Sequence, residues 1–268
     1  MGKKRVLYVS QEIVPYTGET TMGEVASLLP QKTQEKGKDI RMFLPKFGII
    51  NERRHQLHEV IRLSGMNLIV NDIDQPLIIK VASIPQARMQ VYFIDNDEYF
   101  KRKFTTVDKK EKFYEDNDER ALFFCRGVIE SVKKLGWSPD VIHCNGWMAS
   151  FLPMYLKKFY HDDPIFEKTK VVFSFYDHSF EGTLNEGLAD KMKFDGFSDE
   201  DVAGFDAADN KKLIETAIKY SDAVVKGSSE LDADLNKMIK SAKLPTLEFA
   251  DSEYKEQYKP FYESLFED

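Results

Sequence analysis

Residues 140–153 read Asp140-Val-Ile-His-Cys-Asn-Gly-Trp-Met-Ala-Ser-Phe-Leu-Pro153 and carry the clearest fold signal in the chain. It predicts a short buried strand over 141–143, a tight turn at Asn145-Gly146 and a helix that opens at Trp147. A strand that runs straight into a helix is the unit of an open, doubly wound sheet. Ligands of such sheets bind at the carboxyl ends of the strands, so we expect the functional site at this turn.

Further apolar runs on both sides of this stretch extend the pattern. Arg5–Ser10, a helix opening at Thr21 and Asp39–Leu44 form a strand-helix-strand unit, and Thr21 with Glu24 has the spacing of a capping box. Residues 58–94 alternate as a hairpin insertion that returns to the main sheet. Apolar residues at helical spacing after residue 120 predict a helix that Gly136 ends, and Ser228-Ser229 is the expected N-cap of a later helix. We expect one α/β domain over residues 1–268, with a Rossmann-like, doubly wound, mostly parallel sheet. Its expected strands are 5–10, 39–44, 89–94, 140–143, 170–175 and 222–225, followed by a strand and helix extension over 244–268.

Composition excludes several classes of protein. The chain has 268 residues, 42% of them hydrophobic, and a formal net charge of −7, which argues for a packed core and against a nucleic-acid partner. No apolar run reaches membrane-spanning length, and Met1-Gly2-Lys3-Lys4 leads into a strand without the pattern of a signal peptide. Cys125 and Cys144 lack metal-type spacing and indicate free thiols in a cytoplasmic protein.

Neither a cofactor nor a metal is expected from the motifs. The chain lacks a glycine-rich dinucleotide fingerprint. His55 and His58 stand three apart without a third ligand nearby, and we interpret them as surface residues.

Three segments carry a resemblance to a known family. Residues 143–149, His-Cys-Asn-Gly-Trp-Met-Ala, resemble the His-Ala-His-Asp-Trp-His-Ala turn of bacterial glycogen and plant starch synthases, which transfer glucose from ADP-glucose to an α-1,4-glucan. Residues 114–120 are similar to the family's Tyr-Gly-Asp-Asn-Ala-Glu-Arg, and residues 91–100 to Val-Tyr-Phe-Leu-Asp-Asn-Pro-Glu-Tyr-Phe. The resemblance spans about residues 4–230 and implies the N-terminal, acceptor-side half of a GT-B type glycosyltransferase.

The chain departs from the family where the chemistry is expected. Gly146 replaces the acid of the turn, and Gly18 replaces the lysine of the first loop, whose paired glycines become Thr20 and Thr21. The family's histidine and asparagine that hold the donor glucose become Tyr176 and Asp177. The second domain, which in the family binds ADP, has no counterpart in these 268 residues.

These residues define the expected site at the carboxyl edge of the sheet. The candidate ligand-binding residues are Tyr16, Gly18, His143, Asn145, Trp147, Tyr176 and Asp177. Asp177 and His178 are candidate catalytic residues. In one interpretation they form an acid-base cluster with Glu181 near His143. In the other they only finish a strand and cap a turn. We expect the main concave polar surface to lie here, because aromatic rings beside polar groups suit a sugar. Its expected lining residues are Tyr16, His143, Asn145, Trp147, Tyr176, Asp177 and His178.

Two functions remain open. In the first, the chain binds an α-glucan, a malto-oligosaccharide or another partner and has lost the chemistry of glucosyl transfer. Alternatively it is a glucosyltransferase completed by a second polypeptide.

Overall fold

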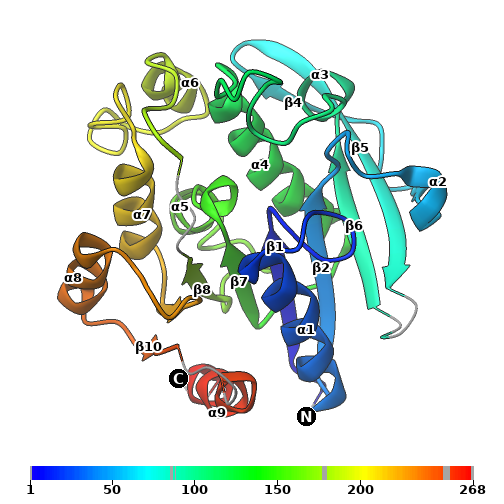
Figure 1. Cartoon of the computed structure of the whole chain (residues 1–268), viewed down its shortest axis with the longest axis vertical. Coiled ribbons are helices and arrows are strands. Elements are labelled where there is room, and N and C mark those ends of the chain that lie inside the picture. Colours follow the sequence, from blue (N-terminus) through cyan, green and yellow to red (C-terminus); the bar gives the residue numbers. More distant parts are fainter. Residues whose placement is uncertain (1, 85–86, 88, 177–179, 250–253, 267–268) are drawn as a thin grey trace.

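The computed structural model describes residues 2–84, 87, 89–176, 180–249 and 254–266. A ten-stranded sheet runs through the molecule in the order β10-β9-β8-β7-β1-β2-β6-β5-β3, with β4 paired to β5 (Figure 1). The strands from β10 to β6 are parallel, and β5, β4 and β3 are joined by antiparallel pairs. The α/β class and the mostly parallel sheet are thus confirmed.

The six expected parallel strands are present, and their ends agree with the prediction or differ from it by at most two residues. They are β1 (Arg5–Ser10), β2 (Asp39–Pro45), β6 (Met89–Asp95), β7 (Val141–Asn145), β8 (Lys170–Phe175) and β9 (Ala223–Lys226), and the strand of the expected extension is β10 (Thr246–Leu247). The insertion consists of β3 (His58–Glu59), β4 (Met66–Val70) and β5 (Ile73–Ile84). The β4–β5 pair is the expected hairpin, and β6 is the return to the main sheet.

The helices are α1 (Thr21–Glu35), α2 (Glu52–His55), α3 (Asp97–Phe100), α4 (Asn117–Leu135), α5 (Leu152–Phe159), α6 (Leu188–Phe194), α7 (Asn210–Lys219), α8 (Ala233–Ala242) and α9 (Tyr254–Phe266). The longest is α4, whose apolar stripe predicts it, and Gly136 ends it in the left-handed conformation. In the described part of the chain, no helix combines the length and the apolar character needed to cross a membrane.

Two sets of helices cover the two faces of the sheet. Thr33 of α1 and Tyr262 of α9 both bond Tyr8 of β1, so these helices lie on the face to which Tyr8 points. On the opposite face, α4 approaches β6 so closely that a Cβ at Gly127 would lie 3.0 Å from Cγ2 of Ile94. Side chains alternate between these faces along each strand.

Three helix starts differ from the sequence prediction. The N-cap of α1 is Thr20, whose Oγ1 accepts from the Gly23 amide at 3.0 Å, so Thr21 is already helical and the expected capping box is wrong. A 3₁₀ turn occupies Trp147–Ala149, and α5 begins only at Leu152. The cap before α8 is Asp232 rather than Ser228 or Ser229. Before α1 and α8 a nearby residue of a capping type sets the boundary, and before α5 the 3₁₀ turn sets it.

The direction in which the chain adds strands to the sheet reverses between β1 and β7. From β1 the chain moves to β2 and β6 on one side, and later to β7, β8 and β9 on the other. The carboxyl ends of β1 and β7 therefore flank the switch point, where ligands of doubly wound sheets bind.

Candidate functional site

His143 lies inside β7 and not at its end. Its side chain is fully buried, and its ring contacts Tyr262 of α9 and Ser174 of β8. The expectation that His143 lines a concave surface is wrong, because α9 covers the face of the sheet to which it points.

Five side chains in this region form a hydrogen-bonded series that we call the buried polar chain: Ser174, His143, Tyr262, Tyr8 and Thr33. The series ends where the Thr33 hydroxyl donates to the Leu29 carbonyl, at 2.9 Å. Tyr8 must then donate to Thr33, and Tyr262 to Tyr8, at 2.7 and 3.2 Å.

This order of donors fixes the histidine tautomer. Since the Tyr262 hydroxyl donates to Tyr8, it accepts from Nδ1 of His143 at 2.6 Å, and Nε2 accepts from Ser174. Burial lowers the pKa of His143 to about 3, so the ring is neutral at ordinary pH. A neutral imidazole shut away from solvent stabilises the fold and cannot reach a substrate.

The switch point itself is filled by Gln11, which follows β1. Its Oε1 accepts from the Met148 amide at 3.0 Å, and its side chain lies against Gly146, which has φ +85°. A Cβ at Gly146 would lie 2.6 Å from Cδ of Gln11. An acidic side chain at position 146 would therefore collide with Gln11.

Two more of the expected residues are used to join the ends of β7 and β8. The Tyr176 hydroxyl donates to Oδ1 of Asn145 at 2.9 Å, and both side chains are buried. Tyr176 also lies against Gly227, where an added Cβ would meet its ring at 2.4 Å. The structure thus brings Asn145 and Tyr176 together, as expected, but in the interior.

Tyr16 and Gly18 lie on the loop between β1 and α1. The Tyr16 ring packs edge-on against Phe93 and His55, and burial raises its pKa to about 12. Gly18 is exposed, and a Cβ there would meet no atom within 4 Å. Asp177 and His178 lie outside the described residues, so their assignment stays a prediction.

A cavity of about 410 Å³ opens at the carboxyl edge, and we call it the edge pocket. Its aromatic lining consists of Phe47, Phe113, Trp147 and Phe180. Its other lining residues are Gln11, Glu12, Thr105, Thr106, Val107, Glu111 and Glu181. Of the residues that the sequence suggested for the site, Trp147 and Glu181 line this pocket.

Three of the four aromatic residues of the edge pocket, Phe113, Trp147 and Phe180, form one cluster. The rings of Phe113 and Phe180 stack with centroids 4.9 Å apart, and Trp147 meets Phe180 edge-on at 5.1 Å. Phe113 and Phe180 come from loops, so sequence periodicity did not single them out. An aromatic residue directly before Glu181-Gly182 was the available signal.

The charge of the lining limits the ligand. Among the described lining residues are three glutamates and no lysine, arginine or histidine. At the nearby start of α1, the Gly23 amide is already bonded to Thr20, and Thr20 donates to Glu12. The described lining therefore offers a diphosphate no cation, and the Gly23 amide at the nearby helix start is already used. The described residues also contain no group of three or more His, Cys, Asp or Glu side chains that could hold a metal ion.

Comparisons with known proteins agree with this architecture. Residues 5–242 match the family described as the starch synthase catalytic domain. Glycogen synthase of Chlorobium luteolum is 34% identical over 234 residues, which are 86% of this chain and 46% of that protein. Glycogen synthase of Chlorobium chlorochromatii is 36% identical over 185 residues, 67% of this chain and 37% of that protein. The chain thus spans about half the length of these relatives, or less.

A solved structure supports the fold. The catalytic domain of starch synthase IV from Arabidopsis thaliana, bound to ADP and acarbose, superimposes with a TM-score of 0.70 at 18% identity. The match covers 92% of this chain and 51% of that one.

Proposed function

The chain belongs to the starch synthase catalytic domain family, and from this premise we propose that it binds an α-glucan or malto-oligosaccharide without transferring glucose by itself. The observation that carries the proposal is the edge pocket, where four aromatic residues stand beside glutamate, glutamine and threonine side chains. Aromatic rings pack against the apolar faces of sugar rings, and the polar groups accept or donate hydrogen bonds to their hydroxyls.

The same pocket argues against turnover of a nucleotide sugar by this polypeptide alone. Glucosyl transfer leaves a diphosphate on which negative charge develops, and cationic groups must stabilise it. The described lining supplies carboxylates instead, and Gly18 stands where the resemblance places a lysine. Tyr176, which stands in the place of the donor-binding histidine, is bonded to Asn145.

A larger hollow of about 550 Å³ between α7 and α8 suits a sugar less well. Its lining mixes lysine and acidic side chains with aliphatic ones and contains no aromatic residue among those described. It also lies away from the carboxyl ends of β1 and β7, so we place the glucan in the edge pocket.

The second candidate is a glucosyltransferase that another polypeptide completes. It is favoured by the length of the relatives, of which this chain spans about half. Adding the separately produced second half of the Chlorobium luteolum enzyme would then give glucose transfer from ADP-glucose. We further propose a cytoplasmic location, supported by the two free, buried thiols of Cys125 and Cys144.

Calorimetry tests the first proposal, with maltoheptaose and ADP-glucose titrated separately. We expect maltoheptaose to bind with a Kd of about 1 mM, because a single half-cleft covers one side of the ligand. Phe180→Ala removes a ring of the aromatic cluster and should weaken binding by about fivefold. Phe194→Ala, a substitution at an exposed position of α6, is the matched control and should leave binding unchanged. Binding of ADP-glucose but not of maltoheptaose would overturn the proposal.

A further inference from the structure

The edge pocket has two walls that come from segments far apart in the sequence. Thr105, Thr106 and Phe113 belong to the loop between α3 and α4, whereas Phe180 and Glu181 precede α6. The walls meet at the stacked pair of Phe113 and Phe180. Neither wall is a strand of the sheet, so other contacts must fix the distance between them.

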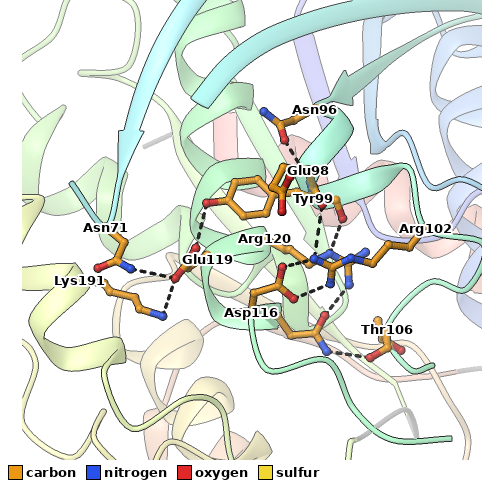
Figure 2. Close-up of polar contacts among 11 residues, drawn as sticks. Asn71, Asn96, Glu98, Tyr99, Arg102, Thr106, Asp116, Glu119, Arg120 and Lys191 are labelled. Carbon is orange, nitrogen blue, oxygen red and sulfur yellow. Dashed lines mark hydrogen bonds and ion pairs between the residues drawn. The ribbon is translucent and has the colours of Figure 1, made fainter. Parts of the chain in front are cut away.

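The first wall is held by the start of α4. Asp116 makes a two-pronged ion pair with Arg102 (Figure 2). Nδ2 of Asn117 donates to the Thr106 carbonyl at 2.8 Å. These contacts tie Arg102 and Thr106, in the first part of the loop, to the start of the helix. Arg120, which is fully buried, adds a bond from Nε to the Tyr99 carbonyl at 2.7 Å.

The helix α6, which follows the second wall in the chain, is held by the next two residues of the same helical turn. Nζ of Lys191, on α6, lies 2.7 Å from Oδ2 of Asp118 and 2.8 Å from Oε1 of Glu119. Figure 2 shows that Glu119 also accepts from Asn71 of the hairpin turn and from the Tyr99 hydroxyl. Residues 116–119 therefore contact both the loop of the first wall and the helix that follows the second wall.

The lysine contacts are buried. The side chain of Lys191 is 9% exposed and that of Asp118 is 0% exposed. Burial alone would lower the pKa of Lys191, but its bonds to Asp118 and Glu119 raise it, so the lysine stays charged. Removing one partner of such a pair leaves the other charge buried and uncompensated.

We propose that Lys191, through its ion pairs with Asp118 and Glu119, sets the position of the Phe180 wall relative to the Phe113 wall and is thus a positioning residue for the glucan. This inference rests on the proposed function of the pocket. Lys191 is not among the residues that line the pocket, so its effect on affinity acts through α6. Binding is tightest when the walls are held in the bound arrangement beforehand.

Lys191→Met tests the inference, because methionine has a similar length and no charge. We expect maltoheptaose affinity to fall about fivefold at a temperature where the variant is folded. Lys193→Met is the matched control: it lies on the same helix, pairs at the surface with Asp199 and should bind like the wild type. Lys191→Arg keeps the charge and should recover most of the affinity.

Trp147 provides a readout that loss of stability alone would not change. Its ring lies 5.1 Å from that of Phe180, so movement of this wall shifts its resonance when tryptophan is replaced by 5-fluorotryptophan. The other tryptophan, Trp137, bonds Asp39 far from the pocket and is the internal reference. We expect the Trp147 signal to shift in Lys191→Met without ligand, and in Asp118→Asn if the lysine variant fails to fold.

The two readouts separate this inference from the proposed function. A Trp147 signal that stays in place in both variants, with only a lower Tm, would overturn the positioning role. Absence of maltoheptaose binding in the wild type would overturn the proposed function, while the fluorine shift would still decide whether Lys191 couples the walls.

Discussion

The buried polar chain passes through β1, β7 and β8, whereas the edge pocket lies beyond the carboxyl ends of these strands, and the two regions use their side chains in opposite ways. In the buried polar chain, His143 is enclosed by α9 and bonded on both ring nitrogens. In the edge pocket, Trp147, only four residues later, faces a cavity of about 410 Å³. A polar residue near a strand end can therefore contact a ligand only if no helix covers its face of the sheet. Substitutions in the first region should therefore affect stability, and substitutions in the second should affect binding.

His143→Ala should show the largest effect. It leaves a cavity and deprives Tyr262 and Ser174 of a partner, so the free energy of unfolding should fall by about 3–5 kcal/mol. Urea unfolding measures this change, with the exposed His161→Ala as control. Maltoheptaose affinity of the folded variant should equal that of the wild type. A variant that keeps its stability and loses affinity would show that His143 belongs to the binding site, and the contrast between the two regions would be wrong.

The pH dependence of stability should follow from the same residue. Burial holds the pKa of His143 at about 3 in the folded protein, below its ordinary value of 6.5. The unfolded chain therefore takes up a proton first, and stability is fully present above pH 6.5 and declines as the pH falls toward 3. The decline contributed by this group approaches about 1.4 kcal/mol per pH unit. In His143→Gln the slope between about pH 5.5 and 4 should be smaller by this amount, and an unchanged slope would show that His143 does not titrate as buried.

The loop before α1 gives a smaller effect. Thr20→Ala removes the cap on the Gly23 amide and should cost about 1 kcal/mol of unfolding free energy. Thr21→Ala, at the adjacent exposed position, should change it by less than about 0.5 kcal/mol. Thermal unfolding of the two variants side by side measures the difference. Equal losses would mean that the sequence-based assignment of Thr21 as N-cap was correct after all.

Gly18→Lys should have the smallest effect. The position is exposed and a Cβ there meets nothing within 4 Å, so the free energy of unfolding should change by less than about 0.5 kcal/mol. The variant should also remain unable to bind ADP-glucose, because Gly146 and Tyr176 still stand where the family has its acid and its histidine. If calorimetry detected heat from ADP-glucose binding to this variant, one lysine would be sufficient to restore binding of the nucleotide sugar.

The sequence predicted the scaffold better than the site. Apolar runs located the parallel strands, and Gly136 located the end of α4, because both signals are local. His143 could not be placed, since its partner Tyr262 lies 119 residues away and nothing local shows that α9 covers that face. Phe113 and Phe180 were missed because loops carry them, and contacts such as Asn117 with Thr106 fix those loops only in the folded chain. In the segment 114–120, which is similar to the family's motif, Asp116, Asn117 and Asp118 bond Arg102, Thr106 and Lys191 of other segments.

The central claim is that this chain has kept a sugar-binding surface and does not transfer glucose alone. Purified protein incubated with ADP-[14C]glucose and glycogen tests it most directly, with incorporation compared to a boiled sample. We predict no incorporation above the boiled sample. Steady incorporation that follows the protein through purification, and disappears in Tyr176→Ala or His178→Ala, would contradict the account and make the chain an enzyme.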